Sequence, residues 1–399
     1  MTDLPYGLTA EALAAAEAET DPTSLASAGR LRARLGVDLA AAAVSQVVLR
    51  RQARAKFGDA AASMFFTRDG LEQATRPEVA AYHARHFTDA AVRRVVDLGC
   101  GIGADALAFA AAGMDVTAVE IDPLTIAAAR ANLSILVSSR RSGAGPVPGR
   151  AEVVLGDAEE MGERLLQPGD AVFCDPARRT AAGRVWRVED FRPSWEFVRS
   201  LLGGRRISAV KLGPALPHGL IPTGVHAEWV SHSGQVVEVF LSSGPSTTGG
   251  RSALVWPDHR LEVPPHLPEL PLSPPLRYLY EPDGAVIRAG ALRVVGALLS
   301  GALLDPKIAY LTSDELVATP YATAFRVLEM LPYKERLLRQ WVKKHQVGTL
   351  EIKKRGLEVD PAELRRRLRL QGPERATLIL SRTVAGARAI VVERLPAQA

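Results

Sequence analysis

The sequence predicts an α/β fold whose central feature is a mostly parallel sheet. From Val95 onward, short apolar segments read as strands, and helical stretches such as ADALAFAAAG and PLTIAAARANL lie between the earlier ones. Continuous apolar strands that alternate with helices are typical of a parallel sheet buried on both faces. The chain has 399 residues, of which 47% are hydrophobic and 23% charged, and this composition fits two or three soluble globular domains.

Changes of texture along the chain divide it into regions. Residues 1–60 are rich in alanine and predict helices, with Gly36 and Gly58 as helix stops. Residues 61–256 form the predicted sheet domain, in which SGQVVEVFLSS and RSALVW are expected to pair as a terminal antiparallel ribbon. Residues 257–282 contain eight prolines, and this density predicts a linker or an extended arm rather than a strand or a helix.

Residues 283–399 predict an α+β module with an unusual charge. After an initial helix, the pattern from Lys334 onward gives a helix, a strand, a second helix and two closing strands. From Lys334 to Ala399 there are 16 Lys and Arg against 7 Asp and Glu, a net charge of +9, whereas the whole chain carries +5. Such a local excess indicates either solvated basic faces or a nucleic-acid surface, and composition does not decide between them.

Composition also excludes several classes of protein. With only Cys100 and Cys174, a disulfide scaffold is not expected, and a reducing cytoplasm is the expected compartment. The N-terminal segment lacks the basic and apolar regions of a signal peptide, and no apolar run is long enough for a membrane span. The eight histidines are scattered without the spacing of metal ligands, so no metal site is expected.

The most informative segment is VVDLGCGIGADALAFAAAGMDVTAVEID. A strand ends at Asp97, and Gly99, Gly101 and Gly103 then form a tight turn into a helix. Glycines let the backbone approach a ligand closely, and the start of the helix offers free N–H groups. Glu120 closes the second strand, where a carboxylate can accept hydrogen bonds from ribose hydroxyls.

The glycine turn alone fits two cofactors, because Gly99-x-Gly101-x-x-Ala104 also matches the dinucleotide fingerprint. Asp97 favours a ligand with an ammonium group, since its charge would repel a pyrophosphate. Three further acidic positions lie at the same edge of the sheet, where open α/β sheets bind ligands. They are Asp122, Asp157 (followed by Ala158) and Asp175.

Together these motifs, over residues 95–180, resemble the class I S-adenosylmethionine-dependent methyltransferases. The D-x-G-x-G-x-G turn, the acid after strand two, the acid after strand three and the D-P-x-x motif after strand four occur in the family's order. The resemblance implies a Rossmann-like, seven-stranded sheet and S-adenosylmethionine as cofactor. It assigns the methionine part to Asp97, Gly99, Gly101 and Gly103, the ribose to Glu120 with Asp122 beside it, and the adenine to Asp157 and Ala158.

The segment Asp175-Pro176-Ala177-Arg178 resembles the [DN]-P-P-[YFW] motif of amino methyltransferases. In that family the acidic or amide side chain and the proline carbonyl accept hydrogen bonds from the target amine, which aligns its lone pair with the methyl group. Asp175, Pro176 and Arg178 are therefore the expected catalytic residues. Arg178 replaces the aromatic residue, and a guanidinium can stack on a base or hold a phosphate, so the target atom stays open. A purely structural role for Asp175 is the alternative.

Upstream, Thr75-Arg76-Pro77-Glu78 predicts the start of a helix with Thr75 as its N-cap. The segment is similar to a T-P-E segment in methyltransferases of the trimethylguanosine-synthase type, where it helps to close the cofactor pocket. This likeness makes Thr75 a candidate cofactor contact, and an ordinary capped helix is the alternative. Lys211 follows the fifth predicted strand and is expected to be a solvated strand end, with contact to a phosphate as the alternative.

The whole chain also resembles bacterial methyltransferases with a C-terminal THUMP-like domain, in stretches such as FFTRDGLEQATRPEVA, CDPARR and VGTLEIKKRGLEVDPAELRRRLRL. THUMP domains accompany RNA-modifying enzymes, so the resemblance implies RNA, either tRNA or rRNA, as the partner. Trp341 is expected in the core of this module. The candidate RNA-binding residues lie in the densest basic runs: Lys353, Lys354, Arg355, Arg365, Arg366 and Arg369.

The sequence thus predicts a cytoplasmic S-adenosylmethionine-dependent methyltransferase that methylates a nucleobase nitrogen of RNA, with the basic C-terminal module binding the RNA. One alternative is a methyltransferase of a protein or a small molecule. Another is a protein that binds S-adenosylmethionine and RNA without transfer activity, because the motif at Asp175 is incomplete. An NAD-dependent oxidoreductase is a more distant alternative.

Overall fold

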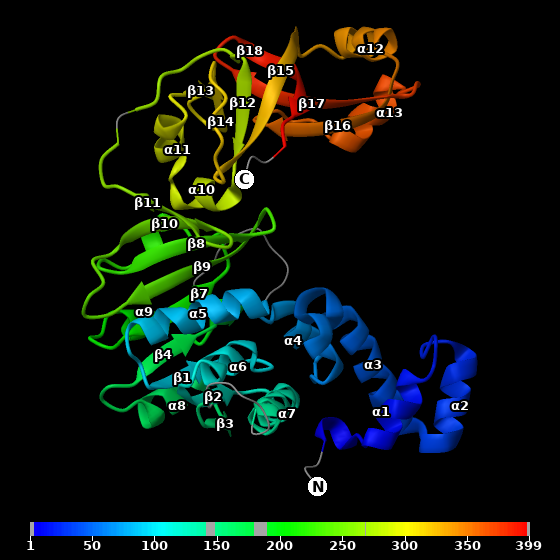
Figure 1. Cartoon of the computed structure of the whole chain (residues 1–399), viewed down its shortest axis with the longest axis vertical. Helices are drawn as coiled ribbons and strands as arrows, with labels where there is room; N and C mark the ends of the chain where they lie inside the picture. The colour runs from blue at the N-terminus through cyan, green and yellow to red at the C-terminus, as the bar shows by residue number, and fades with distance from the viewer. Residues whose placement is uncertain (1–3, 141–147, 179–189, 268, 397–399) are drawn as a thin grey trace. The chain divides into compact units, whose positions relative to one another are not determined.

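The computed structural model describes residues 4–140, 148–178, 190–267 and 269–396 (Figure 1). The chain divides into two compact units. One comprises Met1–Leu212 with Leu241–Thr247, and the other comprises Gly213–Phe240 with Thr248–Ala399. This division differs from the boundary expected at residue 256, because two segments of the predicted sheet domain group with the C-terminal residues.

The N-terminal helices are α1 (Ala10–Glu17), α2 (Leu25–Leu35) and α3 (Val37–Phe57), as the alanine-rich pattern predicts (Figure 1). Gly36 and Gly58 follow α2 and α3 with φ of 81° and 57°, which confirms both as helix stops. These helices share one apolar core with the start of the sheet domain. Its fully or almost fully buried members include Ala12, Ala16, Ala43, Ala53, Ile102 and Ala128.

The central sheet has the strand order β11-β10-β8-β9-β7-β4-β1-β2-β3 within the described residues. Five of its strands pair in parallel, as predicted: β1 (Arg94–Leu98), β2 (Asp115–Glu120), β3 (Ala151–Leu155), β4 (Ala171–Cys174) and β7 (Ser208–Leu212). Every residue of β4 is buried, whereas β3 at the edge is not, because only the central strands have neighbours on all sides. The helices before and between them are α5 (Pro77–Asp89), α6 (Ala104–Ala111), α7 (Pro123–Arg140), α8 (Ala158–Leu165) and α9 (Trp195–Leu202).

Strands β8 (His226–His232) and β9 (Gln235–Ser243) complete the expected seven, and β10 (Gly250–Val255) and β11 (His259–Val263) extend the sheet beyond them. The expected ribbon of β9 with β10 is wrong. β10 pairs in parallel with β8 and antiparallel with β11. A two-residue turn with positive φ at both positions, Ser233-Gly234, joins β8 directly to β9, so the free edge of β8 receives β10.

The proline-rich segment 257–282 is not simply a linker. It contains β11 near its start and β12 (Tyr278–Pro282) at its end, so the expectation that proline excludes strands is wrong at both ends. The reason is placement, because the prolines flank β11 and only the last residue of β12 is a proline. The part between is held as well, since Leu303 N donates to the Pro271 carbonyl at 2.8 Å.

The C-terminal sheet has the order β13-β14-β12-β15-β18-β17-β16 (Figure 1). The prediction of helix, strand, helix and two strands from Lys334 onward is confirmed. From Gly284 to Arg394 the helices and strands are α10 (Gly284–Ala289), α11 (Leu292–Leu298), β13 (Ala302–Asp305), β14 (Ile308–Ser313), β15 (Ala322–Pro332), α12 (Glu335–Lys344), β16 (Val347–Arg355), α13 (Pro361–Leu368), β17 (Glu374–Thr383) and β18 (Gly386–Arg394).

Helices α12 and α13 pack on this sheet through an apolar core that includes Leu338, Leu350, Leu364 and Leu378. Trp341 belongs to the same core, as predicted, and its indole N–H donates to Glu329 at 2.7 Å. On α13, the buried residues Leu364 and Leu368 are four positions apart, so they share the face that points to the sheet. The basic residues between them therefore face away from the core or toward its rim.

We predict that Leu364→Ala destabilises the C-terminal sheet by about 2–5 kcal/mol, because a fully buried leucine leaves a cavity. Hydrogen exchange of the β16 and β17 amides, followed by mass spectrometry, measures this local stability. Arg366→Ala on the same helix is the control. Its side chain is exposed, so exchange is expected to change by about 0.5 kcal/mol or less. Equal exchange in the two variants would contradict the packing of α13 on the sheet.

Candidate functional site

The glycine turn after β1 has the backbone that the motif requires. Gly99, Gly101 and Gly103 have φ of 86°, 56° and 84°, a region that disfavours side chains. A Cβ at Gly99 would also lie 3.1 Å from the carbonyl oxygen of Asp175, at the end of the neighbouring strand β4. The turn therefore brings the carboxyl ends of β1 and β4 together without side chains in between.

Asp97 lies on β1 just before this turn, and its carboxylate is fully buried. Neither carboxylate oxygen has a hydrogen-bond partner among the described residues. Burial raises the pKa of Asp97 well above its ordinary value, and the neighbouring charges of Asp105 and Asp175 raise it further. A buried carboxylate without a donor is unfavourable unless a ligand supplies one, so Asp97 fits the ammonium group of S-adenosylmethionine.

Glu120 connects the end of β2 to the glycine turn. One of its carboxylate oxygens accepts a hydrogen bond from Gly101 N at 3.0 Å, and the other accepts from the N–H groups of Ile121 and Asp122, both at 2.9 Å. The carboxylate is thus held in one orientation beside the turn. This is the position at which a ribose hydroxyl would meet it in the fold that the sequence predicts.

Asp122 and Asp157 both act as helix N-caps. Asp122 accepts from Thr125 N at 2.7 Å at the start of α7, and Asp157 accepts from Glu159 N at 2.8 Å at the start of α8. Ala158 is the first residue of α8 and is half-buried. These caps fix where the two helices begin at the ligand-binding edge of the sheet.

Asp175 does not stand alone at the end of β4. Cys174 is the partner of Val210 on β7, so the next residues, Asp175 and Lys211, lie side by side. Lys211 Nζ forms an ion pair with Asp175 Oδ2, and only 13% of the lysine side chain is exposed. The expectation that Lys211 is a solvated strand end is therefore wrong. The physical reason is the register of β4 with β7, which places the Lys211 ammonium beside the Asp175 carboxylate.

The same lysine connects to Thr75. Lys211 Nζ donates to Thr75 Oγ1 at 3.0 Å, and Thr75 Oγ1 donates to Asp105 Oδ2 at 2.6 Å. The predicted N-cap role of Thr75 is wrong, since α5 begins at Pro77 after Arg76 and has no side-chain cap. The hydroxyl is engaged instead by two charged groups in the interior.

Asp105 and His83 complete this polar cluster. His83 is fully buried and its Nδ1 lies 2.7 Å from Asp105 Oδ1. Burial by itself would raise the pKa of Asp105, but the charge and hydrogen bond of His83 hold that pKa below its ordinary value. Sequence reasoning missed both residues. Asp105 carried a signal, as the single charged residue of an apolar helix, whereas His83 carried none.

Lys56 of α3 supports the same region from the N-terminal helices. Its Nζ donates to the carbonyls of Leu71, Glu72 and Ala74 at 2.7, 3.1 and 2.8 Å. Burial lowers the pKa of Lys56 to about 8, and the positive charges of Arg76 and Lys211 contribute. The segment that leads into Thr75 is therefore fixed by a partly buried ammonium.

The residues beside Asp175 and the two cysteines lie at the same edge of the sheet. Pro176 is buried, and β5 (Ala177–Arg178) pairs with β6 (Phe191–Arg192), although the side chain of Arg178 lies outside the described part of the chain. Cys100 and Cys174 are buried, and burial raises the pKa of both thiols well above the ordinary value. Neither cysteine therefore has the properties of a reactive thiolate.

The structure separates the predicted RNA-binding residues into two groups. Lys353 Nζ contacts Glu281 at 2.7 Å and Arg355 lies 3.8 Å from the same carboxylate, so these two cations share one counter-charge. The remaining cations are Lys354 near the end of β16, Arg365 and Arg366 on α13, and Arg369 directly after α13. Lys354, Arg366 and Arg369 are exposed and Arg365 is half-buried.

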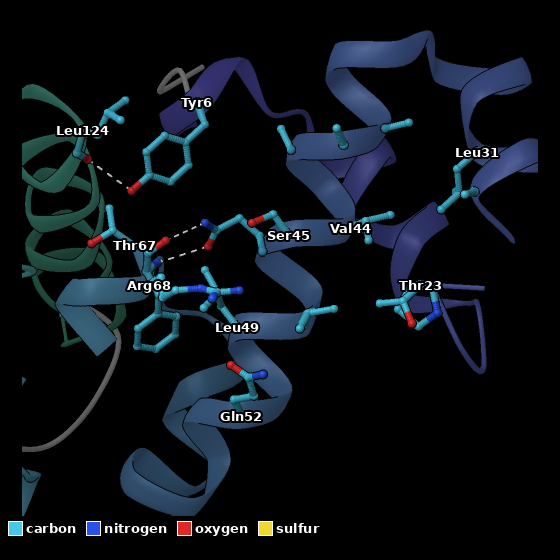
Figure 2. A pocket seen from close by; sticks show the side chains of 18 of the residues that line it. Tyr6, Thr23, Leu31, Val44, Ser45, Leu49, Gln52, Thr67, Arg68 and Leu124 are labelled. Atoms are coloured by element: carbon cyan, nitrogen blue, oxygen red, sulfur yellow. Dashed lines mark hydrogen bonds between the residues drawn. The ribbon is translucent and has the colours of Figure 1, made fainter. Parts of the chain in front are cut away.

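Within the described residues, no group of three or more His, Cys, Asp or Glu is arranged to hold a metal ion. None of the described helices has the length and apolarity to cross a bilayer. A cavity of about 610 Å³ lies beside α3, where Tyr6 donates to the carbonyl of Leu124 at 3.1 Å (Figure 2). Its lining includes Thr67 and Arg68 but none of the predicted site residues, so it is separate from the Asp97–Asp175 region.

We propose that Asp97 binds the ammonium group of S-adenosylmethionine. On this proposal, Asp97→Asn is predicted to weaken S-adenosylmethionine binding about 10- to 100-fold, because an uncharged amide replaces the carboxylate. Because a bound cation favours the ionised carboxyl, binding to the wild-type protein releases a proton wherever free Asp97 is protonated. The affinity therefore rises as the pH increases through the raised pKa of Asp97.

Calorimetry in two buffers with different ionisation enthalpies measures both the affinity and the proton count. Asp97→Asn is expected to lose the proton release attributable to this carboxyl. Equal affinity and an equal proton count in the variant and the wild type would contradict the role of Asp97.

Comparison with known proteins agrees with this geometry. Residues 322–394, which contain β15 to β18, match the family model described as THUMP domain-like. Proteins from two strains of Mycobacterium tuberculosis, each described as an uncharacterized S-adenosylmethionine-dependent methyltransferase, are 33% identical to this chain over 369 residues. The match covers 89% of this chain and 96% of theirs.

The crystal structure of a Porphyromonas gingivalis W83 protein described as a methyltransferase has the same fold. It aligns with a TM-score of 0.73 at 22% identity and covers 96% of this chain and 98% of its own. The near-complete match to the mycobacterial proteins shows more than a fold. The chain belongs to the family of S-adenosylmethionine-dependent methyltransferases, and S-adenosylmethionine is its cofactor.

Proposed function

We propose that this methyltransferase transfers a methyl group to a nucleobase nitrogen of RNA, either tRNA or rRNA, in the cytoplasm. The observation that carries the proposal is the position of Asp175. It follows β4 directly, its carbonyl lies against the glycine turn, and Pro176 comes next. Open α/β sheets bind their ligands at this edge, so a carboxylate here faces the reacting groups.

We assign the cofactor contacts to the same edge. Asp97 and the glycine turn would hold the methionine part, Glu120 and Asp122 the ribose, and Asp157 with Ala158 the adenine. Thr75 would close the pocket from the side of α5, where its hydroxyl is already fixed by Asp105 and Lys211. The carboxylate of Asp97 gives the strongest support for these cofactor contacts. It is fully buried and has no hydrogen-bond donor among the described residues.

The chemistry requires alignment more than acid–base strength. S-adenosylmethionine, when bound, supplies an electrophilic methyl group on a sulfonium sulfur, and transfer leaves the electron pair of the broken carbon–sulfur bond on sulfur. Asp175 and the carbonyl of Pro176 accept hydrogen bonds from the target amine and so direct its lone pair. The amine's proton then leaves through the Asp175 carboxylate to water. Arg178 would contact the base or an adjoining phosphate.

RNA as the substrate is supported by the C-terminal unit. Residues 322–394 match the THUMP domain-like model, and the net charge of +9 is confined to the last 66 residues. We propose that the exposed cations Lys354, Arg366 and Arg369 bind phosphates together with Arg365. Lys353 and Arg355 contribute less, because both already interact with Glu281.

Asp175→Ala is predicted to lower methyl transfer about 100-fold or more while the affinity for S-adenosylmethionine changes little, because the variant loses the orientation of the nucleophile. Methyl-labelled cofactor added to RNA from a deletion strain gives the rate. Mass spectrometry of nucleosides from the deletion strain and its parent identifies the methylated nucleoside that is missing. Methyl transfer at the wild-type rate by the variant would contradict the role of Asp175. Label found only in protein or metabolites would contradict RNA as the substrate.

Replacing Arg366 and Arg369 with glutamine is predicted to weaken RNA binding and to reduce the slope of log K against log salt by about 1.5, because two phosphate contacts are lost. Binding of total tRNA and rRNA at several salt concentrations measures the slope. The control replaces Arg164 and Arg199, two exposed arginines of α8 and α9, with glutamine. Identical slopes for the two double variants would contradict the RNA surface proposed here.

A further inference from the structure

Lys211 is a charged residue at this edge of the sheet that belongs to none of the motifs found in the sequence. It is the fourth residue of the five-residue strand β7, and its side chain is 13% exposed in an ion pair with Asp175, whose side chain is 29% exposed. A lysine seldom stays this buried without a specific partner. Its position therefore needs an explanation in the chemistry of the site.

Asp175 and Thr75 contact the Lys211 ammonium directly, and Asp105 and His83 fix Thr75 in turn. The strand register puts this ammonium beside Asp175, and Thr75 from the loop before α5 accepts a hydrogen bond from it at 3.0 Å. Thr75 is oriented in turn by Asp105 of α6, and Asp105 by His83 of α5. The ring of His83 lies against Phe173 of β4, with 5.3 Å between the centroids. The chain of contacts thus returns to the strand that carries Asp175.

Among the described residues, the carboxylates of Asp97 and Asp105 lie near the pair. Removal of the Lys211 ammonium leaves Asp175 beside Asp97, and like charges near one another favour the protonated form. A protonated carboxyl would donate a hydrogen bond instead of accepting one. Within the described residues, the charged groups that interact with Lys211 or Asp175 are Asp97 of β1, Asp105 of α6 and Lys56 of α3. The groups that act on these three residues or on Cys174 are Glu120 of β2, Glu159 of α8, His83 of α5, Glu72 and Arg76.

We propose that Lys211 is a positioning residue for methyl transfer, which holds Asp175 ionised and in one orientation as a hydrogen-bond acceptor. This inference rests on the proposed role of Asp175 in the methyl-acceptor site. Thr75, Asp105 and His83 contribute to this role, because they fix the Lys211 ammonium and thereby the orientation of the Asp175 carboxylate.

The pair also restricts the nucleophile. An ionised carboxylate accepts hydrogen bonds and repels lone pairs, so it selects a group that carries a proton, such as an exocyclic amine. A ring nitrogen without hydrogen has no proton to offer to Asp175. During transfer the nitrogen–carbon bond forms as the carbon–sulfur bond breaks, the electron pair stays on sulfur, and the nitrogen's proton passes to Asp175 and then to water. Lys211 keeps its own protons throughout.

The test compares Lys211→Met with Lys211→Arg and with the matched control Lys307→Met, an exposed lysine of the C-terminal unit. The full-length variants receive methyl-labelled S-adenosylmethionine and an extract of the deletion strain. Label is then counted in the RNA, protein and small-molecule fractions between pH 5.5 and 9. Calorimetry with S-adenosylmethionine and thermal unfolding show that each variant is folded.

Lys211→Met is expected to reduce kcat about 30-fold or more near neutral pH, with less than a threefold change in cofactor affinity. The acidic limb of its pH profile is expected to move to higher pH, because the carboxylate loses its cation. Lys211→Arg restores part of the rate and the original limb, since a guanidinium keeps the charge. A purely structural lysine would change stability without moving the profile.

The proposal is overturned if folded Lys211→Met has the rate and pH profile of Lys307→Met. Because all three fractions are counted, this outcome is distinct from a failure of the RNA proposal. Label that appears only in protein or in small molecules refutes RNA as the substrate, whereas the comparison of the lysine variants still holds in that fraction. Absence of label from every fraction, with cofactor binding intact, overturns both proposals.

Discussion

The structure depends on the compensation of buried charge at the carboxyl ends of β1, β4 and β7. Asp97, Asp105 and Asp175 approach one another there, in an interior where burial of an uncompensated carboxylate raises the free energy of the folded state. Lys211 and His83 compensate two of the three. Asp97 alone has no donor within the described residues, and the family's cofactor carries the ammonium group that can supply one.

The backbone around this cluster is arranged to allow such close approach. Gly99 has no side chain where β1 meets β4, and a Cβ there would crowd the carbonyl of Asp175. Glu120 then ties the turn to β2 through the N–H of Gly101. From the other side, Lys56 of the N-terminal helices holds the carbonyls that precede Thr75. The N-terminal helices therefore help to fix the segment that carries Thr75.

The C-terminal unit shows why net charge is an incomplete guide to function. Its cations have two different tasks. Lys353 and Arg355 compensate Glu281, and Arg367 pairs with Glu335 and Glu363, so these residues contribute to the fold. The cations that remain exposed on β16 and α13 are available to a polyanion, and there are fewer of them than the composition indicates.

The sequence by itself determined the parallel sheet, the glycine turn and the order of the C-terminal elements, because these follow from local periodicity and from backbone preferences of glycine. Asp97, Glu120 and Asp175 were found in the same way, since each stands at a fixed offset from a strand end. The tertiary structure decided the rest. The register of β4 with β7 places Lys211 beside Asp175. Thr75 donates a hydrogen bond to Asp105 instead of capping α5, because segments distant in the sequence are in contact. Such pairings depend on which strands and helices become neighbours, and the local pattern of residues contains no information about that.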